Sequence, residues 1–94
     1  MTDRQKLIKL IESYLEKQIT AKTFSDNYEM LYWRDLDEDG SISAEEEEEF
    51  RELGEVVARY SPFEEELIKY DSVYFSGEDV YRTAKKVYRI IKKI

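Results

Sequence analysis

The sequence contains no cysteine and no histidine among its 94 residues, and it has only 3 glycines and 1 proline. Without cysteine the chain can form neither disulfides nor thiolate metal sites, and it has no cysteine nucleophile. Without histidine it lacks the commonest general base and the commonest zinc ligand. The scarcity of glycine and proline argues against a loop-rich or many-turned β protein. We therefore expect a binding protein and not an enzyme, in a reducing compartment such as the cytoplasm.

Long apolar runs are missing as well. No stretch approaches the length of a membrane span, and no apolar run follows basic residues near the N-terminus, so we expect neither a transmembrane segment nor a signal peptide. Hydrophobic residues make up 41% of the chain and charged residues 39%. This balance predicts one compact domain over residues 1–94 with a strongly solvated exterior.

The net charge of −7 is unevenly distributed along the chain. Residues 35–55 hold 11 acidic side chains and a single basic one, Arg51, whereas residues 80–94 hold 6 basic side chains and none that is acidic. Nucleic-acid binding needs clustered positive charge on the docking surface, so we expect no direct contact with nucleic acid. The favoured partner has a positive surface, either a basic protein or a cation.

Helix-start signals recur along the chain and divide it into four amphipathic segments. Thr2 and Ser43 begin capping boxes, and Thr20 and Ser76 are further N-cap candidates. Apolar residues then follow each start at helical spacing, with Tyr32 as an additional candidate for the core. The predicted inward residues are Leu7, Ile8, Leu10, Ile11, Tyr14, Leu15, Ile19, Phe24, Tyr28, Leu31, Phe50, Leu53, Val56, Val57, Tyr60, Val80, Ala84, Val87, Ile90 or Ile91, and Ile94.

These segments predict an all-α protein, an antiparallel four-helix bundle with a short extra helix or turn before the last helix. The extra element would begin at Ser61-Pro62-Phe63-Glu64, where proline suits the first helical position, and would end near Lys69. Residues 70–75 include β-favouring side chains, but the segment is too short to build a sheet alone.

The segment from Asp35 to Glu46 matches the twelve-residue calcium loop of an EF-hand, with Gly40 at the sharp bend. However, the flanking positions, which are normally apolar, are Arg34 and Glu47, and there is no second loop. The simpler interpretation is an acidic connection between helices in which Ser43 is only a cap. A calcium-binding module is the alternative, and its ligands would be Asp35, Asp37, Asp39, Ser41 and Glu46, with Ser43 acting through water.

Three segments, in the same order along the chain, carry a family resemblance. They are Gln18-Ile19-Thr20-Ala21-Lys22-Thr23-Phe24 followed by Tyr28; Ala58-Arg59-Tyr60-Ser61-Pro62 with acidic residues just beyond; and Gly77-Glu78-Asp79-Val80 followed by Val87 and Ile91. This ordered set resembles the colicin D-type immunity proteins, the bacterial self-protective colicin-like immunity family.

The resemblance implies a protein that binds a cognate toxin nuclease and covers its basic active site with an acidic surface. The toxin would be a colicin or a contact-dependent inhibition toxin, of the tRNA-cleaving kind. The resemblance also implies that the acids around the end of the third helix face the toxin. Here the matching residues are Glu52, Glu55, Tyr60, Glu64, Glu65, Glu66 and Asp71. We expect no cofactor unless calcium binds at residues 35–46, and a monomer is favoured.

Overall fold

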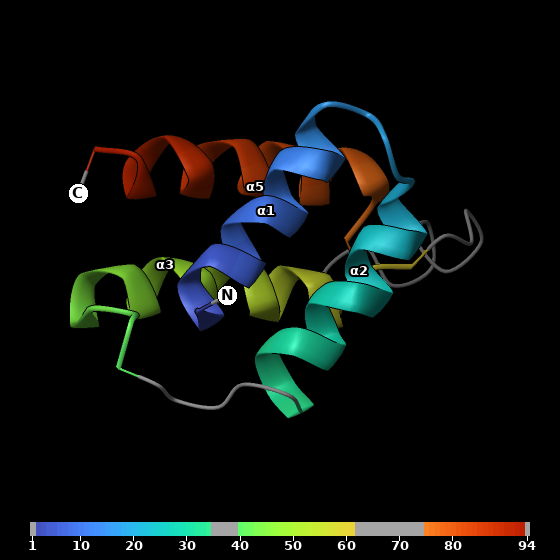
Figure 1. Cartoon of the computed structure of the whole chain (residues 1–94). Coiled ribbons are helices and arrows are strands. Elements are labelled where there is room, and N and C mark those ends of the chain that lie inside the picture. The colour runs from blue at the N-terminus through green and yellow to red at the C-terminus, as the bar shows by residue number, and fades with distance from the viewer. Residues whose placement is uncertain (1, 35–39, 62–74, 94) are drawn as a thin grey trace.

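The computed structural model describes residues 2–34, 40–61 and 75–93 (Figure 1). This part of the chain is all-helical, as predicted, and its only β pairing is an isolated bridge between Tyr60 and Phe75. None of its helices is long and apolar enough to cross a membrane. The elements are α1 (Asp3–Leu15), α2 (Ala21–Glu29), the π-helical turn η1 (Met30–Arg34), α3 (Ala44–Ala58) and α5 (Gly77–Ile91).

Each α-helix in the described part of the chain begins just after the serine or threonine that the sequence predicts as its cap. The four N-caps are Thr2, Thr20, Ser43 and Ser76. Each has an extended backbone, and its hydroxyl accepts a hydrogen bond from the backbone N–H three residues further on. This bond satisfies an N–H that has no partner within the helix. Gln5, Glu46 and Asp79 bond back to complete three capping boxes.

The end of α1 has the geometry of a Schellman motif, which turns the chain toward α2. The Lys17 N–H donates to the Tyr14 carbonyl at 3.0 Å, and the Gln18 N–H donates to the Ser13 carbonyl at 2.9 Å. Lys17 has a φ of 62°, in the left-handed region that usually belongs to glycine at this position. A side chain in this conformation costs about 1–2 kcal/mol, so the turn at Lys17 lowers the stability of the folded protein.

The helices α3 and α5 lie side by side and run in opposite directions (Figure 1). Glu52 of α3 pairs with Lys86 of α5, and the chain leaving α3 meets the chain entering α5 at the bridge between Tyr60 and Phe75. Helix α1 packs on α5, and α2 packs on α3 and on α1. The buried core between them consists of Leu7, Ile11, Tyr14, Phe24, Tyr28, Tyr32, Phe50, Leu53, Val57, Val80, Ala84, Val87 and Ile91.

A row of aromatic rings crosses this core from α1 to η1. Tyr14 and Phe24 stack with centroids 4.4 Å apart, and Tyr28 and Tyr32 stack at 5.8 Å. The Tyr28 hydroxyl donates to the Phe50 carbonyl at 2.8 Å, so this buried polar group is satisfied. Burial raises the pKa of Tyr28 well above its usual value and that of Tyr14 to about 12. The neutral phenols therefore belong to the folded state.

Several predicted inward residues are only half-buried and pack against the edge of the core: Ile8, Leu10, Leu15, Ile19, Leu31, Val56 and Tyr60. At the end of the second helix a different residue takes the buried position. The sequence spacing favours Leu31, with Tyr32 as a further candidate, but Tyr32 is the buried residue and Leu31 is only half-buried. The reason is the π-helical turn, whose i→i+5 hydrogen bonding winds more residues into a turn than an α-helix does. Phe24 and Tyr28 of α2 and Tyr32 of the π-helical turn share the buried side.

Several predicted features lie outside the described residues. They are the short element from Pro62 to Lys69, residues 70–74, the loop acids Asp35, Asp37 and Asp39, and Ile94. The described residues on either side of residues 62–74 are hydrogen-bonded to one another. The Ser61 N–H donates to the Phe75 carbonyl at 3.0 Å, and the Phe75 N–H donates to the Arg59 carbonyl at 2.8 Å.

Candidate protein-binding face

Five charged side chains of α3 line a shallow hollow of about 460 Å³ on the outer side of the helix. We call this surface the acidic face, and its residues are Glu48, Glu49, Arg51, Glu52 and Glu55. The helix presents Glu48, Arg51 and Glu55 outward because Phe50, Leu53 and Val57 recur at helical spacing and are buried. Glu49 and Glu52 are half-buried, and Oε2 of Glu49 is out of contact with solvent. The periodicity of α3 therefore sorts its residues into a core side and a charged side.

The charges of the acidic face are only partly balanced. Lys86 donates from Nζ to Oε1 of Glu52 at 2.9 Å. This hydrogen bond and the negative charge of Glu52, with a smaller contribution from Glu49, raise the pKa of Lys86. Glu48 and Glu55 are exposed and form no ion pair within the described part of the chain. The surface thus keeps an excess of negative charge that attracts a cationic partner.

Two of the residues predicted to contact a toxin, Glu52 and Glu55, lie together on the acidic face. Tyr60 lies just beyond the end of α3, where it is half-buried and bridged to Phe75. The structure therefore brings the two carboxylates into one surface, whereas Tyr60 packs against the core and does not line that surface. The other predicted contact residues, Glu64, Glu65, Glu66 and Asp71, are outside the described residues.

The sequence prediction of the site did not include Trp33, although its side chain is 52% exposed. Its indole ring lies against α3 at Gly54, where an added Cβ would be 3.3 Å from Cζ2 of Trp33. The next residue along α3 is Glu55 of the acidic face. A signal was present, since a lone tryptophan stands beside polar residues at a helix end, but helical periodicity assigns it only to that end.

The calcium alternative depends on Glu46, which would have to ligate the ion through both carboxylate oxygens. Glu46 is buried, and its Oε2 pairs with Nε of Arg4 at 2.5 Å. Its Oε1 accepts from the backbone N–H of Ser43 at 3.1 Å. Burial alone would raise the pKa of Glu46, but the bonds from Arg4 and Ser43 outweigh it and lower that pKa. Calcium would therefore have to displace protein partners from both oxygens.

The remaining calcium ligands are not brought together in the described part of the chain. Asp35, Asp37 and Asp39 lie outside it, so their positions relative to Ser41, which would ligate through its backbone carbonyl, are not described. Among the described residues, no group of three or more histidine, cysteine or acidic side chains is arranged to hold a metal ion. The calcium loop stays a prediction from the sequence.

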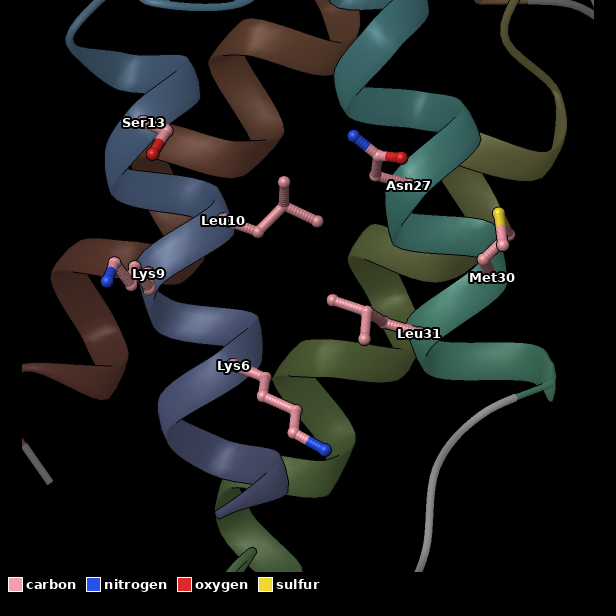
Figure 2. A pocket seen from close by; sticks show the side chains of 7 residues that line it. All are labelled: Lys6, Lys9, Leu10, Ser13, Asn27, Met30 and Leu31. Carbon is pink, nitrogen blue, oxygen red and sulfur yellow. The ribbon is translucent and has the colours of Figure 1, made fainter. Parts of the chain in front are cut away.

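A second hollow, of about 450 Å³, lies between α1 and α2 (Figure 2). Leu10 and Leu31 point into it from opposite sides, and Lys6 reaches toward the α2 side near one end. No acidic side chain lines this groove, and neither Lys6 nor Lys9 forms an ion pair with a described residue. A basic partner would meet like charge here, so the groove suits control substitutions. Its full lining is Lys6, Lys9, Leu10, Ser13, Asn27, Met30 and Leu31.

Comparison of the chain with family models, with curated proteins and with solved structures finds no match. The resemblance to colicin D-type immunity proteins consequently rests on the three quoted sequence segments, and it stays a prediction.

Proposed function

We propose that this protein is an immunity protein that binds a cognate bacterial toxin nuclease and blocks its basic active site. The observation that carries the proposal is the acidic face of α3, where Glu48 and Glu55 are exposed without an ion pair in the described part of the chain. A nuclease that binds RNA phosphates needs a cationic active site. Opposite charges favour fast and specific docking of the two surfaces.

The inhibitor acts as a monomer. It acts in the cytoplasm, because the RNA substrate of the toxin is there. The toxin is a tRNA-cleaving colicin or a contact-dependent inhibition toxin. We further propose that the helices form an antiparallel four-helix bundle. The toxin also contacts four acidic residues, Glu64, Glu65, Glu66 and Asp71. The protein binds and does not catalyse, since the sequence holds neither histidine nor cysteine.

The decisive experiment is co-expression with the nuclease domain of the toxin encoded beside this gene. Wild-type protein should protect the cells, and the double substitution Glu52→Lys with Glu55→Lys should weaken binding of the nuclease roughly 10–100-fold by calorimetry. The expected loss comes from placing two positive charges against a cationic active site. An absence of protection by the wild-type protein would refute the proposal.

The matched control reverses two exposed carboxylates away from the acidic face, Glu16→Lys with Glu78→Lys, and changes the net charge by the same amount. This variant should bind as the wild type does. Both variants should keep their thermal stability within about 1 kcal/mol, because exposed ion pairs contribute little. Equal weakening in both variants would show an effect of net charge and would place the contact elsewhere.

The calcium alternative is tested in the same experiment. Binding is measured once with millimolar calcium and once with a chelator, and the proposal expects the same affinity in both. Binding that requires calcium would favour the EF-hand interpretation of residues 35–46.

A further inference from the structure

Two large hydrophobic side chains are exposed in the described part of the chain, and both lie on η1. Met30 is 49% exposed and Trp33 is 52% exposed. Met30 lines the groove between α1 and α2, whereas Trp33 lies against α3 at Gly54. The π-helical conformation of η1 is rare and is found frequently at functional sites. These observations single out Trp33 as a surface feature beside the acidic face.

The indole of Trp33 is held in place before any partner arrives. It packs edge-on against the Tyr32 ring, with centroids 4.8 Å apart and planes at 85°. Tyr32 is itself buried, and its hydroxyl donates to Oε1 of Glu47 at 2.6 Å. The absence of a side chain at Gly54 leaves room for both rings. A side chain that is already ordered loses little conformational entropy on binding.

The ring on which Trp33 packs has charged neighbours on α3, most of them acidic. The neighbouring Tyr32 is buried, bonded to Glu47 and close to the charge of Glu55, which together raise its pKa, while Arg51 opposes the shift. The indole therefore packs on a ring that is bonded to Glu47, and it lies against α3 at Gly54, the residue before Glu55. Binding hot spots have this composition, with a central aromatic side chain surrounded by polar residues that exclude water.

We propose that Trp33 is the apolar anchor of the contact with the nuclease, and this inference rests on the proposed function. The indole enters an apolar pocket on the partner. Lysine or arginine side chains around that pocket then pair with Glu52 and Glu55. The acidic face steers the encounter, and Trp33 holds the complex once it has formed.

Charge excludes the other occupants of this surface. A second copy would bring the same acidic side chains against one another, in a chain that already carries a net charge of −7. An anionic membrane or an RNA strand that stacked on the indole would place its phosphates against Glu47 and Glu55. A protein with a cationic rim is the partner that both the indole and its surroundings fit.

The experiment uses the fact that Trp33 is the single tryptophan of the chain. Adding the nuclease domain, prepared without tryptophan, should shift the emission of wild-type protein to shorter wavelength and reduce its quenching by acrylamide. Trp33→Ala should weaken binding at least about 30-fold in calorimetry, as expected for a hot spot. Met30→Ala is the matched control, since it removes the other exposed hydrophobic side chain of η1, and it should change affinity less than about threefold.

Gly54→Ala is the second variant. It keeps the indole and changes only the surface of α3 against which the ring packs. The new Cβ would lie 3.1 Å from Cδ2 of Tyr32 and 3.3 Å from Cζ2 of Trp33, so the rings must shift. We expect an altered emission spectrum in the free protein and an affinity between those of Trp33→Ala and the wild type.

The outcomes separate the inference from the proposed function. A wild-type protein that fails to bind the nuclease refutes the proposed function, and the inference with it. Tight binding by both wild type and Trp33→Ala overturns the inference alone. An emission shift that follows protein concentration, or the addition of phosphatidylglycerol vesicles, without a response to the nuclease would assign Trp33 to a second copy or to a membrane and would also overturn it.

Discussion

Glu46 shows how one carboxylate can stabilise both a helix and the contact between two helices. It caps α3 through the Ser43 N–H and pairs with Arg4 of α1. Glu46→Gln keeps an acceptor for the cap but loses the ion pair. We expect it to destabilise the protein by roughly 1–3 kcal/mol at pH 7, in the range of hydrogen bonds to charged groups, as measured by urea denaturation.

The pH dependence of this substitution follows from the direction of the pKa shift. Because folding lowers the pKa of Glu46, its contribution is present above the unfolded value of about 4.3 and is lost as pH falls through the folded value. The difference between wild type and Glu46→Gln should therefore shrink at pH 3. Glu48→Gln, an exposed change on the same helix, should have little effect at either pH. A difference for Glu46→Gln that is equal at pH 7 and pH 3 would contradict the ion-pair assignment.

At the scale of helices, the end of α1 contains a residue in an unfavourable conformation. Lys17 has a left-handed backbone, which costs a side chain about 1–2 kcal/mol, whereas glycine adds about 0.5–1 kcal/mol of backbone entropy cost. Lys17→Gly should therefore stabilise the protein by roughly 0.5–1 kcal/mol in thermal or urea denaturation. The same change at Lys9, which is exposed and helical, should destabilise it by about 1 kcal/mol. Loss of stability in both variants would mean that Lys17 is not left-handed in solution.

The helices that the sequence predicts well are those whose signals are local. Ser43 and Glu46 lie three residues apart, and a capping box needs nothing from the rest of the fold. The π-helical turn is different, because Tyr32 becomes inward only when its ring stacks on Tyr28 and its hydroxyl reaches Glu47 of α3. Tyr28 is only four residues away, so spacing already makes Tyr32 a candidate for the core, but the contact with Glu47, 15 residues away, cannot be read from local spacing.

The residues of the candidate site also differ in how well the sequence predicts their positions. Glu52 and Glu55 are predicted by the family resemblance, and periodicity places them on the outer side of an acidic helix, away from its buried residues. Trp33 could not be placed beside them from the sequence. Its position depends on the close approach of η1 to Gly54, a contact between residues that are 21 positions apart.

At the scale of the whole molecule, we propose that steering and holding of the partner depend on different residues. The charge of the acidic face steers it, and the apolar contact at Trp33 holds it. The acidic face attracts a cationic partner over a distance set by the Debye length, which is about 10 Å at 0.1 M salt and about 3 Å at 1 M. The contact at Trp33 acts only after docking. Association of the nuclease should consequently slow at least tenfold between these salt concentrations, while dissociation should change much less.

The variants should change the association rate and the dissociation rate separately, as measured by stopped-flow and surface-binding experiments. Glu52→Lys with Glu55→Lys should slow association at 0.1 M salt and flatten its salt dependence, because the steering charge is gone. Trp33→Ala should leave the association rate and its salt dependence near those of wild type and should accelerate dissociation. Lys6→Glu with Lys9→Glu, in the groove between α1 and α2, should not slow association, because it removes no negative charge. If wild-type association were independent of salt, the acidic face would not be the surface that meets the toxin.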